Sequence, residues 1–175
     1  MNSLRKYRVI AAIVFMLLPA EGYAMENNAP WKSMKLVGEG KLSFLFWDIY
    51  YARLYSADGR YQEQAYPLAL ELTYLRDFTK QQLVEETAKQ WKKLGFEDET
   101  KTQTWLSRLS ELWPDVEEKQ SITLYIDNQN RSFFYFNAEL LGQIDDAEFS
   151  QAFLAIWLSE DTSAPEVRKK LIASL

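Results

Sequence analysis

Residues 38–55 read GEGKLSFLFWDIYYARLY, and this stretch decides the fold of the chain. From Leu42 onward most residues are aromatic, β-branched or large aliphatic, and neither Gly nor Pro interrupts the run, which favours an extended strand. Successive side chains point to opposite faces of a strand, and both alternating sets are mostly apolar, so both faces should be covered. We therefore expect residues 42–55 to form one central strand, not an edge strand. Such a strand would be about 40 Å long, so we expect a bend or bulge near Asp48.

Residues 1–24 have the pattern of a signal peptide. Three basic residues precede an apolar run at residues 9–20, and a small-x-small sequence follows at residues 22–24. An uncleaved membrane anchor is the alternative, but a spanning helix needs about 20 apolar residues and Pro19 interrupts this run. We therefore expect export to the periplasm with cleavage before Met25, and contact with a membrane only through this segment before cleavage.

The remaining residues, 25–175, are expected to form a single domain. Without residues 1–24 the chain has 17 basic and 24 acidic residues, a net charge of −7. An acidic surface disfavours nucleic acid and anionic membrane surfaces as partners. Because the acidic and basic residues are interspersed, solubility is the simplest role for the charge.

The chain contains neither Cys nor His. This composition excludes disulfides, thiol nucleophiles, Ser-His-Asp and Cys-His catalytic sets and the usual zinc sites. The sequence Gly-Glu-Gly at residues 38–40 is too short and too acidic for a phosphate-binding loop. We expect no cofactor and no metal, and any catalysis would need an Asp, Glu, Lys or Tyr with a shifted pKa.

Beyond residue 55 the hydrophobic periodicity predicts strands and helices in groups. Thr79 and Gln82 form a capping-box pattern at the start of one helix, and Asp145 and Glu148 form another. Helices that are grouped, instead of alternating with strands, are typical of an α+β fold with an antiparallel sheet. The expected elements are strands at 33–37, 68–74, 122–126, 132–137 and 139–144, and helices at 79–94, around 105–113, at 145–157 and at 163–171.

Several segments, taken together, resemble the chalcone isomerase-like family. Their order and spacing extend the similarity over about residues 34–173. The segments are GEGKL at 38–42, YYARLY at 50–55, LELTYLRDFT at 70–79, and the pattern FxxAFxxIWL at 149–158 followed by Pro165 and Arg168.

The resemblance implies a long, curved antiparallel β-sheet with helices packed on one face, an open-faced β-sandwich whose ligands lie between the layers. Plant enzymes of the family cyclise chalcones to flavanones, non-catalytic relatives bind fatty acids, and the exported bacterial branch implies no particular reaction. In the enzymes an Arg that follows a Gly helps to hold the substrate phenolate, and Lys41 stands at that position in this chain. Because Lys cannot form the planar fork of Arg, the resemblance supports the fold better than the isomerase reaction.

Three residues are candidate ligand contacts. Lys41 would neutralise a carboxylate or phenolate, although a solvated strand-end lysine is the simpler interpretation. Arg53 lies within an apolar run and needs a partner, either an acidic ligand head or an ion pair with Asp48 or a helix Glu. Tyr55 resembles the ligand-binding tyrosine of the fatty-acid-binding relatives, although a lone tyrosine is more often part of a core.

Four tryptophans lie on helical apolar stripes, at positions 91, 105, 113 and 157. A stripe at helical spacing usually faces the protein core. We therefore favour core packing for these rings over a platform on which a ligand stacks.

We expect a periplasmic protein that binds a small apolar or amphipathic acid, such as a fatty acid, between sheet and helices without catalysis. A protein of envelope interaction or maintenance, with its cleft closed by its own aromatic residues, is the alternative. An enzyme would be an intramolecular lyase of the chalcone isomerase type that uses Lys41 or a tyrosine as its acid–base group.

Overall fold

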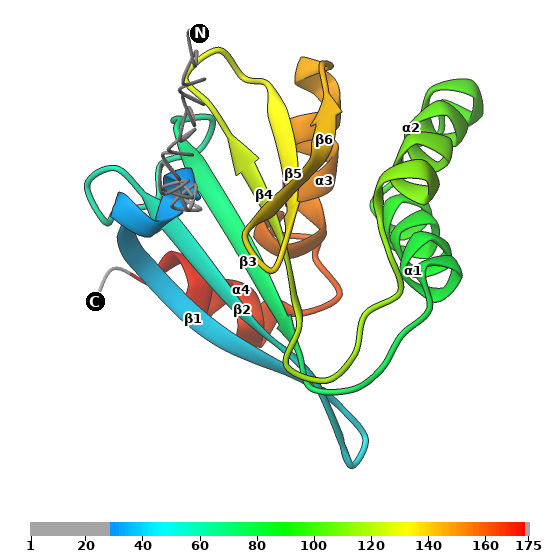
Figure 1. Ribbon diagram of the computed structural model, residues 1–175, viewed down its shortest axis with the longest axis horizontal. Helices are drawn as coiled ribbons and strands as arrows, with labels where there is room; N and C mark the ends of the chain where they lie inside the picture. The colour runs from blue at the N-terminus through cyan, green and yellow to red at the C-terminus, as the bar shows by residue number, and fades with distance from the viewer. Residues whose placement is uncertain (1–28, 174–175) are drawn as a thin grey trace, which may run out of the picture.

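Six antiparallel strands follow one another in chain order across a single sheet, and four α-helices accompany them (Figure 1). The computed structural model describes residues 29–173, so the predicted signal peptide lies outside the described residues. The α+β class predicted from the sequence is confirmed. The elements are η1 (a 3-10 helix, Pro30–Ser33), β1 (Lys35–Phe44), β2 (Trp47–Ser56), β3 (Leu68–Tyr74), α1 (Lys80–Lys93), α2 (Glu99–Leu112), β4 (Ser121–Ile126), β5 (Ser132–Phe136), β6 (Glu139–Ile144), α3 (Ala147–Leu158) and α4 (Pro165–Ile172).

The stretch at residues 42–55 is not one central strand, and that prediction is wrong. The chain turns back at Leu45 and Phe46, so the apolar run forms the end of β1 and nearly all of β2. β1 is an edge strand, and β2 lies between β1 and β3. The register shifts between Leu42 and Ser43, and Ser43 pairs with Asp48 across the hairpin. Two-residue turns usually carry Gly, Asn or Asp, and none of these marks this one.

The helices lie on one face of the sheet, and η1 lies on the other (Figure 1). On the helix side a single core cluster joins the inner residues of the strands to all four helices. On the opposite side a smaller cluster contains Trp31 of η1 and Ala69 of β3, and the ring of Trp31 meets that of Tyr135 edge-on at 4.7 Å. Within residues 29–173, no helix is long and apolar enough to span a bilayer.

Two helix starts test the capping predictions. At α1 the backbone N–H of Gln82 donates to the Thr79 hydroxyl at 3.2 Å, and the backbone N–H of Thr79 donates to the Gln82 side chain at 2.8 Å, which confirms the capping box. At α3 the N-cap is Asp146, not Asp145 as predicted, and its carboxylate accepts from the backbone N–H groups of Glu148 and Phe149. The capping-box spacing fits Asp145 with Glu148, but the carboxylate of the next residue, Asp146, caps the helix without a Glu or Gln three positions on.

The insertion that carries α1 and α2 leaves the sheet after β3 and returns at β4. Its base is closed by an isolated bridge in which Phe78 and Val116 exchange backbone hydrogen bonds of 2.9 and 2.8 Å. Because β3 and β4 pair directly, the sheet continues across the base of this insertion without interruption.

The helix tryptophans are core residues, as predicted. Trp91, Trp105, Trp113 and Trp157 are each no more than 6% exposed. Their rings make mostly edge-on contacts with Phe149, Phe153 and with one another, at centroid distances between 5.3 and 6.2 Å. The buried Trp91 indole N–H donates to the carbonyl of Ala152 at 2.8 Å, so this polar group is satisfied.

The two glycines that begin the decisive stretch allow α4 to approach β1. A Cβ at Gly38 would lie 2.1 Å from the carbonyl oxygen of Lys170 and 2.7 Å from that of Leu171. A Cβ at Gly40 would lie 3.1 Å from Val167 Cγ1 and 3.2 Å from its carbonyl oxygen. The main chain of α4 therefore occupies the space that a side chain at position 38 would need.

We predict that Gly38→Ala destabilises the protein more than Gly40→Ala does. It should lower the free energy of unfolding by about 3 kcal/mol, because the new methyl group meets helix backbone that cannot rotate away. Gly40→Ala should cost about 1 kcal/mol, because its tightest contact is with a side chain. Urea unfolding of both variants measures the difference, and equal losses would contradict this account of the α4 contact.

Candidate ligand-binding site

A cavity of about 810 Å³ lies between the helix-facing side of the sheet and helices α1 and α3. Strand residues from β1 to β5 form its floor, and its exposed lining residues lie mainly along α1 and at the end of β1. The wall is mainly aliphatic and aromatic, which suits an apolar ligand. Residues that form this wall include Leu70, Leu72, Leu124, Phe134, Phe153 and Ile156.

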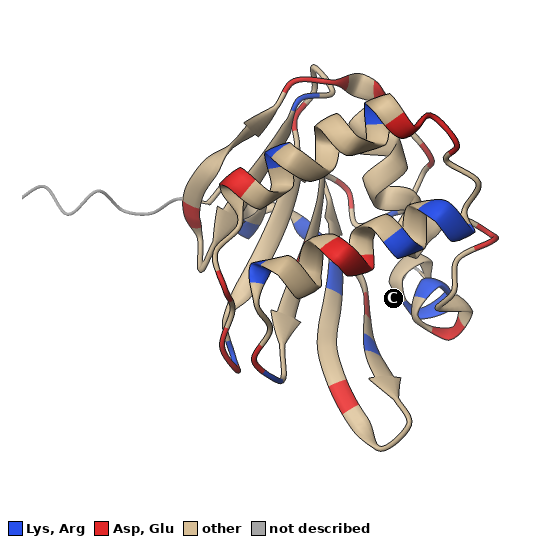
Figure 2. Cartoon of the chain, turned by 90° about the vertical axis from the view of Figure 1, so that its right-hand side faces the viewer, with Lys and Arg blue, Asp and Glu red and all other residues tan. Residues whose placement is uncertain are grey.

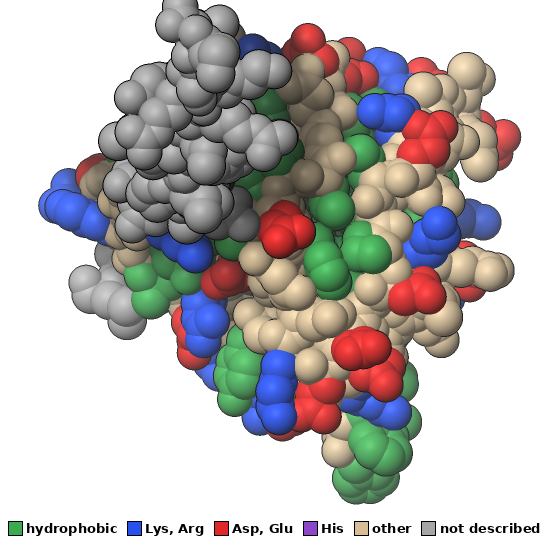
Figure 3. Space-filling view, in the orientation of Figure 1, with side chains coloured by type: hydrophobic (Ala, Val, Ile, Leu, Met, Phe, Trp, Pro, Cys, Tyr) green, Lys and Arg blue, Asp and Glu red, His purple; other side chains and the backbone are tan. Residues whose placement is uncertain are grey.

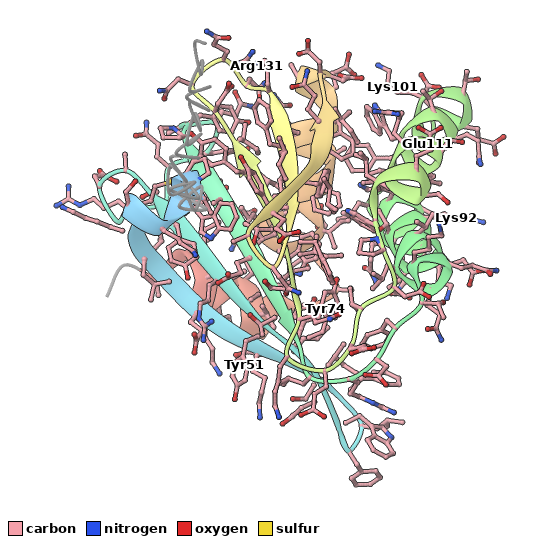
Figure 4. All side chains as sticks on the ribbon, viewed as in Figure 1. Tyr51, Tyr74, Lys92, Lys101, Glu111 and Arg131 are labelled. Carbon is pink, nitrogen blue, oxygen red and sulfur yellow. The ribbon has the colours of Figure 1, made fainter. Side chains whose placement is uncertain are left out.

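Two tyrosines bring neutral polar groups into this apolar wall. Tyr50 and Tyr74 lie on neighbouring strands, with their rings edge-on at 6.1 Å. The Trp157 indole N–H donates to the Tyr50 hydroxyl at 2.8 Å, so the Tyr50 proton is free to be donated in turn. Figure 4 shows Tyr74 toward the end of the sheet from which the β1–β2 hairpin extends.

Burial keeps both tyrosines protonated. Burial raises the pKa of Tyr50, and the hydrogen bond from Trp157 opposes this rise only in part. Burial also raises the pKa of Tyr74, and the neighbouring Tyr50 adds to the effect. Both phenols therefore act as hydrogen-bond donors at neutral pH, not as bases.

Trp113 adds an unsatisfied donor to the cavity wall. Its ring is 5% exposed and lies among the lining residues, and its indole nitrogen has no hydrogen-bond partner within residues 29–173. A buried N–H without a partner costs about 1–3 kcal/mol, so such groups usually meet water or a ligand. The interior thus offers neutral donors to an oxygen atom.

Charged groups appear only where the cavity opens. The charged residues of the lining all belong to α1 and are all exposed: Glu85, Glu86, Lys89 and Lys93. Lys89 lies 3.6 Å from Glu86, whereas no carboxylate of the described residues lies within ion-pair distance of Lys93. An acidic head group at this opening would meet Lys93 while its apolar part filled the interior.

The three residues singled out in the sequence lie outside this cavity. Arg53 and Tyr55 alternate along β2 with the buried Ala52 and Leu54, so they point to the face away from the helices. Lys41, opposite Tyr51 in the hairpin register, lies on that same outer face. Their role as ligand contacts stays a prediction, and the cavity itself is lined by other residues.

Each of the three residues has a protein partner on the outer face. The Lys41 ammonium lies 2.6 Å from Asp48, and this hydrogen bond raises the pKa of Lys41 and lowers that of Asp48. The Tyr55 hydroxyl donates to Glu71 at 3.1 Å, and burial together with the Glu71 charge raises the Tyr55 pKa to about 12.

Arg53 is paired across the strands. Its Nε donates to Glu39 of β1, and its Nη1 lies 3.8 Å from Glu71 of β3. The predicted partners, Asp48 or a helix glutamate, are wrong, because both of these carboxylates lie beside Arg53 in the sheet register. Burial is the largest single effect and lowers the pKa of Arg53, but the hydrogen bond that Arg53 donates to Glu39, together with the nearby negative charges of Glu39 and Glu71, raises the pKa overall.

A second cavity, of about 770 Å³, lies between residues 61–66 and helices α2 and α3. Its two cations already have partners in the protein. Lys101 lies 2.6 Å from Glu148, and Arg168 Nε donates to the carbonyl of Leu158 at 2.8 Å. This cavity is less suited to an apolar ligand than the one between sheet and helices. Among residues 29–173, no three Asp or Glu side chains gather to form a metal site.

A family model described as chalcone isomerase-like matches residues 21–173. The chain belongs to the chalcone isomerase-like family. This membership confirms the resemblance found in the sequence, and the six-stranded antiparallel sheet with helices on one face agrees with that fold.

One known protein is similar to this chain in sequence, and one solved structure is similar to it in fold. It is 27% identical over 146 residues to an uncharacterised protein of Haemophilus influenzae, covering 83% of this chain and 71% of that protein. Its structure resembles the crystal structure of a fatty-acid binding protein of Arabidopsis thaliana, with a TM-score of 0.60 and 15% sequence identity. That match covers 80% of this chain and 87% of the plant chain, and it shows a shared fold.

We predict that Tyr50 and Tyr74 make the protein less stable in alkali. In the unfolded chain their pKa values return to about 10, and in the folded chain they lie above this. The folded state therefore holds more protons above pH 10, and stability falls as the pH rises beyond that value. Urea unfolding at pH 8 and pH 11 should show a smaller loss in the Tyr50→Phe, Tyr74→Phe double variant. An unchanged loss would show that neither phenol is shielded.

Proposed function

We propose that the protein is an exported, periplasmic member of its family that binds a small amphipathic acid, such as a fatty acid, without changing it chemically. The cavity of about 810 Å³ between sheet and helices carries this proposal, because its interior is apolar and its only described cations lie at the opening. Its volume falls within the range of about 300–1,000 Å³ that is typical of small-molecule sites. The signal-peptide pattern of residues 1–24 supports export.

The proposal requires an apolar chain of appreciable length. Each buried methylene contributes about 0.8 kcal/mol, so a chain of ten methylenes contributes about 8 kcal/mol. Association costs about 4–15 kcal/mol in lost freedom, so short acids would gain too little. A medium-chain or long-chain acid is therefore the ligand class that the cavity favours.

Charge determines how such an acid would lie. Neutral tyrosine and tryptophan donors cannot compensate the desolvation of a fully buried carboxylate, which would need a cation. Lys93 supplies positive charge at the opening along α1, whereas Lys89 is already paired with Glu86. We therefore place the carboxylate beside α1 and the apolar tail toward the tyrosines.

The structural neighbour and the position of Lys41 support binding over catalysis. The similar plant structure is that of a fatty-acid binding protein, and we propose the same kind of binding for this chain. Lys41, at the position of the arginine in the plant enzymes, points away from the cavity and pairs with Asp48. Among the described residues that line the cavity, the two tyrosines are protonated at neutral pH, and the exposed carboxylates of α1 are the remaining candidates for a base.

Charge reversal at the opening should separate head-group recognition from tail burial. Lys93→Glu should weaken binding of dodecanoate about fivefold to tenfold, because a partly solvated attraction becomes a repulsion. Binding of dodecanol, measured by the same calorimetric titration, should change less than twofold. Lys92→Glu is the matched control, because Lys92 belongs to the same helix, is exposed and lies outside the cavity (Figure 4). Equal losses of dodecanoate affinity in both variants would contradict the proposed orientation.

Filling the cavity should abolish binding of both compounds. Leu83→Trp places a large ring in the wall formed by α1 and should remove measurable binding of dodecanoate and dodecanol. Leu106→Trp is the control, because Leu106 is equally half-buried but lines neither cavity. Circular dichroism confirms that both variants fold. Unchanged binding in folded Leu83→Trp would exclude this cavity as the site.

A further inference from the structure

The tip of the β1–β2 hairpin exposes four consecutive large apolar side chains. Phe44, Leu45, Phe46 and Trp47 are 67%, 78%, 97% and 56% exposed. Within residues 29–173, Leu140 of β6 is the only other large hydrophobic residue in this exposed class. The tip projects beyond the rest of the molecule and ends in a cluster of apolar atoms (Figures 1 and 3). Contiguous exposed apolar residues usually mark an interaction site.

The backbone conformation of the turn is unfavourable for the residues that form it. Leu45 has a φ of 55°, a conformation that Gly, Asn or Asp adopt more readily. Polar or glycine residues would therefore serve both the turn geometry and the solubility of the hairpin better. The apolar residues at this position improve neither property, so they point to a role outside the isolated molecule.

Polar groups of both signs lie immediately behind the apolar tip. The Arg76 guanidinium lies 4.1 Å from the centre of the Trp47 ring, and the Lys41 ammonium lies 2.6 Å from Asp48. The tip itself carries no charge (Figure 2). An apolar end, a tryptophan and then paired charges follow the order of environments across a bilayer surface, from acyl chains to head groups. Arg and Lys side chains can extend from such a position to the phosphate level.

The balance of charge selects the kind of bilayer. The two cations behind the tip match a phosphate, and Asp48 matches the amine of a zwitterionic lipid. The domain as a whole carries more acidic than basic residues, so an anionic surface would repel it. A protein partner is less well matched, because a stable interface needs about 800 Å² on each side and charged residues replace apolar ones directly behind the tip.

The tip is continuous with the ligand cavity. Leu42, Ser43 and Phe44 at the end of β1 belong to the cavity lining, together with Ile49 and Tyr50 of β2. One side of the hairpin is therefore a wall of the cavity, and its end is the exposed apolar cluster. An apolar chain that entered along this wall would remain against protein instead of crossing open water.

We propose that the hairpin tip, Phe44–Trp47, inserts into the interface of a zwitterionic lipid bilayer and that the cavity exchanges its ligand with the bilayer there. The exchange rests on the proposed function, whereas the insertion rests on the exposed tip and the charged groups behind it. From the sequence we expected membrane contact only through the signal segment before its cleavage, because the acidity of the whole chain gives no sign of this local apolar site.

Trp47 provides a direct test of insertion. All six tryptophans lie in the described part of the chain, and Trp47 is exposed whereas the other five are at most 6% exposed. Vesicles of phosphatidylcholine with brominated acyl chains should therefore quench the fluorescence of Trp47 selectively. We expect quenching in the processed protein and its loss in Trp47→Phe, whereas no quenching of either protein would overturn the proposal.

Co-sedimentation with phosphatidylcholine vesicles tests which residues are responsible. Leu45→Asp with Phe46→Asp should lower the vesicle-bound fraction at least tenfold, and the milder Phe46→Ser should lower it in the same direction. Leu140→Asp is the matched control, because Leu140 is 59% exposed on β6 at the other edge of the sheet. All proteins should carry the same processed N-terminus, as verified by mass spectrometry, so that the signal segment contributes nothing to the comparison.

The same variants separate this proposal from the proposed function. Leu45→Asp with Phe46→Asp should bind dodecanoate in solution normally but take up a fluorescent fatty acid from vesicles at least tenfold more slowly. Vesicle binding without any dodecanoate binding would remove the proposed function and leave the insertion intact. Vesicle binding unchanged by the tip substitutions would overturn the insertion. Sedimentation velocity that shows a dimer abolished by these substitutions, without vesicle binding, would assign the tip to a second copy of the chain.

Discussion

The close approach of the α4 main chain to β1 is the contact on which the arrangement of this protein depends. It is possible only because Gly38 and Gly40 leave one face of the strand bare. Once α4 lies on that face, strand alternation directs every second side chain of the hairpin toward the helices. Ala52 and Leu54, opposite the two glycines in register, become core residues. This one contact therefore determines which face of the sheet lines the cavity and which face carries the ion pairs.

Much of the fold could be predicted because its signals are local. The capping box at Thr79 and the left-handed Gly95 mark the two ends of α1, and both are legible in the sequence. The hairpin turn at Leu45 and Phe46 could not be recognised, because its residues continue the apolar alternation of the strands. We propose that the apolar side chains of this turn interact with a partner outside the chain. Sequence rules for turns describe what the fold requires and therefore do not predict such residues.

The candidate site was harder to predict than the fold for a geometric reason. Both alternating sets of the decisive stretch are apolar, so hydrophobicity did not say which set faces the helices. We chose Lys41 and Arg53 as candidate ligand contacts because they are charged, and both lie on the outer face. The cavity is instead built around neutral groups such as Tyr50. A signal was present in the sequence, because the two glycines share the face of Tyr50 and mark the side on which a helix packs.

The bridge between Phe78 and Val116 has a consequence for how the family can diversify. It pins together the two ends of the insertion that carries α1 and α2, while β3 and β4 pair directly beside it. The free energy of closing a loop rises by only about 0.6 kcal/mol for each doubling of its length. Helices in this insertion can therefore gain or lose turns while the ladder of the sheet stays as it is. Since α1 forms one wall of the cavity, the depth of the cavity can evolve independently of the scaffold that supports it.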